Sequence, residues 1–168
     1  MGPEKDIPRA GKMVTFSEDY CFVCGRRNPI GLKLEFDLDK ENRRATNVVS
    51  FSVEHQGWDG VVHGGIIAAV LDDVMAYAIM TTGNMGITTR MSIAYRKPIG
   101  VGEEIHLEGE VVKLTARTAV ARGIAYTMNG SERVLKAEAE GTYYLDRPKG
   151  DDREWANRKP EDRKRTDR

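Results

Sequence analysis

Residues 64–82 read GGIIAAVLDDVMAYAIMTT, and this stretch decides the fold. Its apolar side chains recur on every side of a helical turn rather than along one stripe. A helix that is apolar all round has to be covered by the rest of the protein. Gly83 and Asn84 follow directly and are typical helix-ending residues. The stretch therefore predicts one long, buried helix.

Six stretches around this helix have the pattern of β-strands. Two precede it and four follow it, over residues 32–37, 47–53, 88–95, 104–113, 118–126 and 134–145. Apolar and polar residues alternate in them, and turn-forming pairs such as Asn129-Gly130 separate them. Short connections favour antiparallel neighbours, so we expect the last four strands to form a meander. The predicted fold class is α+β, with an antiparallel sheet wrapped round one long central helix.

The composition indicates one globular domain with charged ends. The chain has 168 residues, of which we assign 1–20 to a leader, 21–145 to the domain and 146–168 to a charged tail. Lys and Arg total 26, as do Asp and Glu, so no net charge favours a nucleic acid or a membrane surface as partner. No apolar run approaches the roughly 18 residues of a transmembrane helix.

Cys21 and Cys24 are the only cysteines, which excludes a disulfide framework. The N-terminal residues lack the apolar stretch of a signal peptide, so we expect a cytoplasmic protein. A structural zinc needs four ligands, and a redox dithiol normally precedes a helix. We therefore predict no metal and interpret the pair as small residues packed in a turn. A zinc shared by two subunits and a redox pair are the alternatives.

Two acidic residues interrupt the apolar helix, and they differ in position. Asp72 lies seven residues after Gly65, which is about two helical turns, so the two share a face. The other residues near that line are mostly alanines, which leaves room for another molecule or subunit. Asp73 points to a different side of the helix. A buried carboxylate is costly unless it is paired, hydrogen-bonded or near water. Asp72 is therefore a candidate functional group.

His63-Gly64-Gly65 is expected to open the helix. The first N–H groups of a helix have no partner within it and lie at its positive end, so they can stabilise an anionic oxygen such as that of a thioester. Asp72 is then a general base for water or a nucleophile. The residues alone leave another interpretation open, in which the glycines form a tight loop, His63 caps the helix and Asp72 pairs with an arginine.

These residues resemble a known family. His63-Gly64-Gly65 with Asp72 nine positions after the histidine is similar to the motif of the hotdog-fold thioesterase superfamily, in its PaaI-like branch. The resemblance continues through Thr88 and residues 95–98 and covers about residues 21–145. Residues 55–65 look like the corresponding stretch of animal mitochondrial acyl-CoA thioesterases of this branch.

The resemblance implies roles for several residues. The active unit is expected to be a homodimer or a dimer of dimers (a homotetramer), with active sites between subunits. Asp72 matches the catalytic acid, His63 and Gly65 match the helix-start oxyanion region, and Thr88 matches a threonine that holds or orients the attacking water. Many relatives have Asn or Gln six residues before the histidine. Here that position is glycine, with Gln56 beside it as a substitute.

The function that these expectations favour is hydrolysis of acyl-CoA thioesters, with coenzyme A as part of the substrate and no other cofactor. The acyl chain is expected in a tunnel lined by residues such as Val62, Met75 and Ile79. Gly64, Gln56 and Val62 are expected to bind the substrate, and its phosphates are expected near Arg90, Arg96 and Lys97. The alternatives are a non-catalytic acyl-CoA binding or sensing protein and a dehydratase of hydroxyacyl thioesters, for which the usual motifs are missing.

Overall fold

The computed structural model describes residues 20–146, and the chain divides into two compact units, Met1–Lys33 and Leu34–Arg168. The predicted leader and charged tail lie outside the described residues, apart from Tyr20 and Asp146. The described part of the first unit is a loop. A backbone hydrogen bond closes it, in which the Leu32 N–H donates to the Phe22 carbonyl over 2.8 Å. This agrees with the turn that the sequence predicts around Cys21 and Cys24.

Helix α1 (Gly64–Met80) has 17 residues and forms where the sequence predicts it. Nine of its residues are buried: Ile67, Val70, Leu71, Val74, Met75, Tyr77, Ala78, Ile79 and Met80. The backbone N–H of Thr81 still bonds back to the last turn, and the helix ends there. None of the helices in the described part of the chain has the length and apolar character needed to cross a lipid bilayer.

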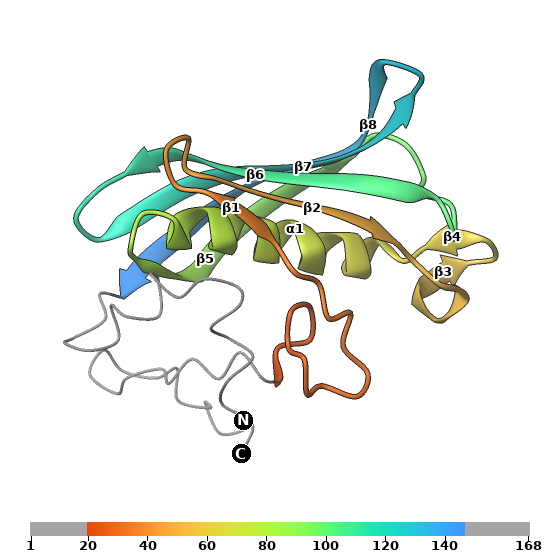
Figure 1. The fold of residues 1–168 in the computed structure, drawn as a ribbon, viewed down its shortest axis with the longest axis horizontal. Coiled ribbons are helices and arrows are strands. Elements are labelled where there is room, and N and C mark those ends of the chain that lie inside the picture. Colours follow the sequence, from red (N-terminus) through yellow and green to blue (C-terminus); the bar gives the residue numbers. More distant parts are fainter. Residues whose placement is uncertain (1–19, 147–168) are drawn as a thin grey trace, which may run out of the picture. The chain divides into compact units, whose positions relative to one another are not determined.

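A six-stranded antiparallel sheet packs against this helix (Figure 1). Its strands are β1 (Asp37–Asp39), β2 (Arg44–Ser50), β5 (Met85–Tyr95), β6 (Glu104–Leu114), β7 (Thr118–Asn129) and β8 (Glu132–Asp146). Their order across the sheet is β1-β2-β6-β7-β8-β5. A short hairpin of β3 (Gln56–Trp58) and β4 (Val61–Val62) precedes the helix. The predicted α+β class, one antiparallel sheet on one central helix, is confirmed.

The structure corrects the predicted meander in one respect. β6, β7 and β8 are consecutive neighbours, and the β7–β8 turn is tight, with Gly130 at a φ of 62°. β5 instead pairs with β8 at the far edge, because the chain leaves the helix on that side and crosses back to β6 through residues 96–103. The first two strands are also displaced, to 37–39 and 44–50, because Asp39 caps a turn by accepting the Asn42 N–H over 3.0 Å.

Two glycines let the helix approach the sheet closely. A Cβ atom on Gly109 of β6 would collide with the Val74 carbonyl of α1. A Cβ atom on Gly123 of β7 would lie 3.1 Å from Met75 Cγ. The backbone of the helix therefore rests almost directly on the central strands. The centre of the helix is fixed by this contact.

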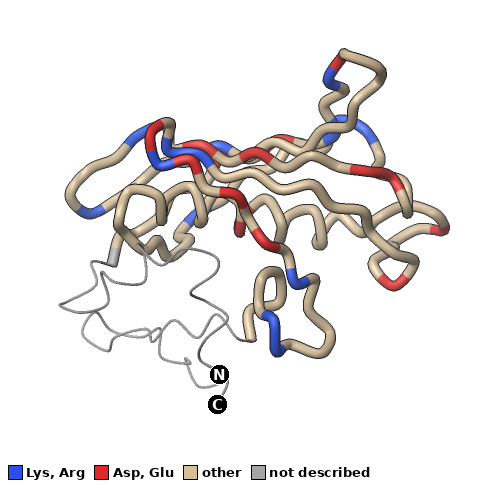
Figure 2. Tube along the Cα trace, viewed as in Figure 1, with Lys and Arg blue, Asp and Glu red and all other residues tan. Residues whose placement is uncertain are grey.

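Charged residues of both signs are spread along the strands and loops (Figure 2). Cross-strand pairs form on the sheet, such as Arg44 of β2 with Glu110 of β6 at 2.9 Å. The helix carries only two charged residues, Asp72 and Asp73. An acidic group in this helix is therefore an exception that needs a local explanation.

Candidate functional site

The helix start is capped by a histidine. His63 Nδ1 accepts the Gly65 N–H over 2.9 Å, and the His63 N–H donates to the His55 carbonyl over 2.8 Å. The ring lies against Gly57, where a Cβ atom would be 3.0 Å from its Cδ2 atom. His63 is thus the hydrogen-bonded cap that the sequence left open as an alternative. The Gly65 N–H is therefore already bonded within the chain.

Gly64 presents the other amide of the helix start. As the first helical residue it has no acceptor for its N–H within the helix. Its carbonyl accepts a hydrogen bond from the hydroxyl of Tyr95, at the end of β5, over 2.8 Å. Tyr95 therefore fixes the start of the helix against the edge strand of the sheet.

Gln56 is used within its own hairpin. Its Oε1 atom accepts the Gly60 N–H over 3.1 Å and so closes the turn between β3 and β4. The side-chain NH2 group, with its two N–H donors, takes no part in this bond. Gln56 therefore shapes the loop that leads to His63, whereas the position six residues before this histidine carries no side chain.

The carboxylate of Asp72 is held by two hydroxyl groups. Thr88 Oγ1 donates to Asp72 Oδ1 over 2.8 Å, and Tyr143 Oη donates to the same oxygen over 2.9 Å. Asp72 is half-buried, and within residues 20–146 it forms no ion pair. The arginine partner that the sequence allowed is therefore replaced by neutral donors.

A β-bulge in β5 places Thr88 beside Asp72. Thr88 is paired with Tyr143 and Arg90 with Thr142, so Thr89 is an extra residue on β5. Thr89 Oγ1 bonds to the Thr142 carbonyl over 2.9 Å. Thr88 thus faces the helix with Tyr143, whereas Arg90 lies on the opposite face of the sheet. The structure brings Thr88 and Asp72 together and separates Arg90 from both.

The two parts of the candidate site are distant within one chain. Gly65 and Asp72 are seven positions apart, which corresponds to about 10 Å along a helix. The helix start and Asp72 are therefore separate parts of the candidate site, and we call them its two half-sites.

A cavity of about 460 Å³ opens beside the helix start. Mostly apolar residues line it, and four residues that the sequence assigned to substrate binding are among them: Val62, Gly64, Arg96 and Lys97. Arg96 Nε bonds to Glu138 over 2.9 Å, whereas Lys97 forms no ion pair with any described residue. The cavity has an apolar interior and cations at its rim.

Two of the three residues that were predicted to line an acyl tunnel lie outside this cavity. Met75 and Ile79 are fully buried, and neither lines the cavity. Met75 packs at Gly123, and Ile79 lies against Gly86, so the sheet covers both residues. Val62 is the one residue of the expected three that lines the cavity.

The sequence analysis missed two tyrosines. Tyr95 and Tyr143 both hold α1 through their hydroxyls, one at its start and one at its middle. Both lie on strands, at positions that face the helix. A polar-tipped aromatic residue at an inward position of a strand is the signal that could have identified them.

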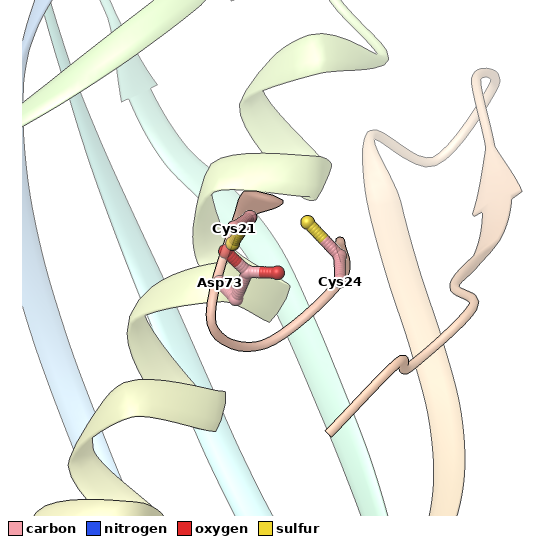
Figure 3. A group of neighbouring side chains, drawn as sticks. All are labelled: Cys21, Cys24 and Asp73. Atoms are coloured by element: carbon pink, nitrogen blue, oxygen red, sulfur yellow. The ribbon is translucent and has the colours of Figure 1, made fainter. Parts of the chain in front are cut away.

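Cys21 and Cys24 belong to the loop of the first unit. The Gly25 N–H donates to the Cys21 carbonyl over 3.0 Å, so the pair flanks a turn. Figure 3 shows both side chains on this loop, and it also labels Asp73 of helix α1. The turn is the setting that the sequence predicted for these residues.

Residues 59–133 match the family model described as the Thioesterase superfamily. The chain is also 34% identical over 62 residues to acyl-coenzyme A thioesterase 13 of Mus musculus. That match covers 36% of this chain and 44% of the mouse protein, so the chain spans less than half the length of this relative.

Several solved structures have a similar fold. A hypothetical thioesterase from Streptococcus pneumoniae, solved with coenzyme A, aligns with a TM-score of 0.62 and 18% identity over 70% of this chain and 88% of its own. Two forms of that protein, with alanine in place of a threonine or an aspartate, are also similar. The Escherichia coli PaaI protein aligns with a TM-score of 0.61 and 16% identity over 68% of this chain and 80% of its own.

The fold is therefore the hotdog fold that the sequence predicted. The predicted resemblance to the thioesterase superfamily, in its PaaI-like branch, is confirmed by the family match and by the structural similarity.

Proposed function

We propose that this protein hydrolyses acyl-CoA thioesters to a free acid and coenzyme A. The observation that carries the proposal is the Asp72 carboxylate, which two hydroxyl groups hold in a helix whose only other charged residue is Asp73. The match of residues 59–133 to thioesterases and the 34% identity to an acyl-CoA thioesterase support the choice of substrate.

Asp72 is the general base in the proposed reaction. Its carboxylate accepts a proton from water while the water oxygen bonds to the thioester carbonyl carbon. The C–S bond then breaks with its electron pair going to sulfur, and the thiolate of coenzyme A takes up the proton. Thr88 donates to Asp72 and keeps lone pairs with which to accept a hydrogen bond from the attacking water.

The helix start supplies the electrophilic half of the reaction. The Gly64 N–H has no acceptor within the helix and lies at its positive end, so it stabilises the oxyanion that forms on the carbonyl oxygen. The Gly65 N–H is already bonded to His63, which holds the first turn in shape. His63 and Gly65 therefore contribute as the cap of this turn.

Each active site is proposed to need two copies of the chain. The two half-sites are about 10 Å apart in one chain, too far for one carbonyl. β5 carries Thr88 and Tyr95 and is an edge strand of 11 residues, which is a template for pairing with another chain. A homodimer, or a dimer of dimers, brings the helix start of one protomer to Asp72 of its partner.

The roles of Asp72 and Thr88 have further support in the Streptococcus pneumoniae protein. The aspartate and the threonine that were replaced there are 16 positions apart. Asp72 and Thr88 are also 16 positions apart and share a hydrogen bond. The same spacing from a helix to the next strand supports the same pairing.

The cavity beside the helix start is proposed to bind the substrate. Its apolar walls, with Val62 and Gly64 among them, suit an acyl or pantetheine chain. Lys97 at its rim suits a phosphate of coenzyme A, and Arg96 can contribute while bonded to Glu138. Arg90 lies on the other face of the sheet and is left out of this site. The cytoplasmic location expected from the sequence stays a prediction.

A second candidate function is acyl-CoA binding without turnover. Gly57 stands where many relatives have Asn or Gln, and the Gln56 carbonyl is used in the hairpin. Carbonyl activation then depends on backbone amides alone. Tight binding of acyl-CoA with no release of thiol would favour this function over hydrolysis.

The test is thiol release from a panel of short-chain, medium-chain and phenylacetyl CoA esters. We expect the Asp72→Asn variant to hydrolyse the best ester about 10² to 10⁴ times more slowly, which is the usual contribution of a general base. Asp59→Asn, an exposed residue in the β3–β4 turn, is the matched control and keeps full activity. An Asp72→Asn variant as fast as the wild type would contradict the proposal.

A further inference from the structure

Tyr143 lies beneath the middle of the helix, where its hydroxyl bonds to Asp72. Its side chain is fully buried. Its hydroxyl is 2.9 Å from Asp72 Oδ1 and 3.3 Å from the Asp72 backbone carbonyl oxygen. The contact therefore fixes both the side chain and the backbone of the proposed general base.

The ring of Tyr143 fits a space that Gly86 and Gly141 leave open because they have no side chains, and we call this space its seat. A Cβ atom on Gly141 would lie 2.6 Å from Tyr143 Cε2 and 2.9 Å from Tyr143 Oη. A Cβ atom on Gly86 of β5 would lie 3.1 Å from the Cβ atom of Tyr143. The absence of side chains at these two positions of the sheet therefore allows the ring to lie under Asp72. A phenylalanine would fill the same seat, so packing alone does not account for the hydroxyl.

The environment keeps the Tyr143 hydroxyl protonated. Burial raises the pKa of the Tyr143 phenol far above its usual value, and the charge and hydrogen bond of Asp72 raise it further. The neighbouring charge of Asp73 acts in the same direction, and a contact with Thr88 opposes it only in part. Tyr143 is therefore a permanent hydrogen-bond donor and does not itself transfer a proton.

The two donors divide the carboxylate into unequal oxygens. Thr88 of β5 and Tyr143 of β8 are register partners, and both donate to Oδ1. Among the residues that the structure describes, Oδ2 receives no hydrogen bond. Two donors on one oxygen fix the plane of the carboxylate. Oδ2 is left as the oxygen that can accept a proton from water.

We propose that Tyr143 is a positioning residue of the thioesterase reaction, which fixes the Asp72 carboxylate and aims its Oδ2 atom at the attacking water. The inference rests on the proposed function and adds a residue that lies wholly inside the protomer. In this arrangement the seat formed by Gly86 and Gly141 belongs to the catalytic apparatus, although neither glycine touches the substrate.

The first test is the ¹³C NMR signal of the Asp72 carboxyl carbon at one pH, assigned with the Asp72→Asn spectrum. In Tyr143→Phe we expect this signal to change its chemical shift and to broaden, because one hydrogen bond to Oδ1 is lost and the carboxylate becomes free to rotate. Tyr144→Phe removes the hydroxyl of the adjacent exposed tyrosine and is expected to leave the signal unchanged. The same signal in wild type and Tyr143→Phe overturns the inference, whether or not the protein proves to be a hydrolase.

The second test is the steady-state kinetics of acyl-CoA hydrolysis. In Tyr143→Phe we expect kcat to fall about tenfold with KM changed less than twofold. An unchanged kcat overturns the inference, while absence of hydrolysis in the wild type overturns the proposed function. If Tyr143→Phe does not fold, 3-fluorotyrosine at position 143 provides a stronger donor. The chemical shift of the Asp72 carboxyl carbon then moves in the direction of a stronger hydrogen bond, and an unchanged signal again overturns the inference.

Discussion

The start and the middle of helix α1 are built in different ways. At the start, His63 caps Gly65 and bonds to His55, so most contacts join residues that are close in sequence. At the middle, Asp72 is held by Thr88 and Tyr143, which lie 16 and 71 residues away. The first half-site is thus made by a loop, and the second is made by the sheet. The geometry of the first half-site should therefore depend on the neighbouring loop, and that of the second on the packing of the helix against the sheet.

The largest effect is expected in a test of whether one active site combines the helix start of one chain with Asp72 of another. Gly65→Val damages the start, because its Cβ atom would lie 2.9 Å from His63 Nδ1, and Asp72→Asn damages the middle. We expect each variant alone to lose activity about 100-fold or more. Co-assembled in equal amounts, they should recover about a quarter of wild-type activity, because half of the two-fold dimers are mixed and each has one intact site.

The mixture is compared with a simple blend of the two purified variants before exchange. Activity that stays at the average of the two variants after subunit exchange would place both groups in one chain. That outcome would break the proposed division of the site between protomers.

Removing the cap tests how far the start depends on its loop. In His63→Ala the Gly65 N–H loses its side-chain acceptor, which costs about 1 kcal/mol of unfolding free energy. Urea unfolding measures this loss. The ¹³C NMR signal of the Asp72 carboxyl carbon should stay as in the wild type, since the middle is held by the sheet. A changed Asp72 signal in this variant would show that the two half-sites are coupled.

The smallest effect is expected at the one long-range contact of the helix start. Tyr95→Phe removes the hydroxyl that donates to the Gly64 carbonyl, at a cost of about 0.5 to 1 kcal/mol. Thermal unfolding measures the loss, and Tyr144→Phe again serves as the control. A larger destabilisation than that of His63→Ala would mean that the sheet, rather than the loop, also determines the helix start.

Much of the fold could be predicted from the sequence because its patterns are local. The apolar run of residues 64–82 and the turn at Asn129-Gly130 specify their structures within a few neighbours. The place of β5 at the edge could not be predicted in this way. The sequence gives the connection between β5 and β6 but contains no local signal that this connection crosses the sheet.

The site shows the same division between local and distant information. His63-Gly64-Gly65 and Asp72 could be singled out from their spacing along one helix. Thr88 and Arg90 have the same parity in their strand, so simple alternation puts both on one face. The extra residue Thr89 places them on opposite faces. Tyr143 could not be assigned, because its role depends on two glycines and a helix that meet it only in the fold.

The close seating of α1 on Gly109 and Gly123 limits how this protein can change over evolution. A helix without space beneath it can neither roll nor slide to suit a longer or bulkier ligand. If the proposed function holds, new acyl preferences have to arise in the β3–β4 hairpin, in residues 96–103 and along β5, while the helix keeps its place.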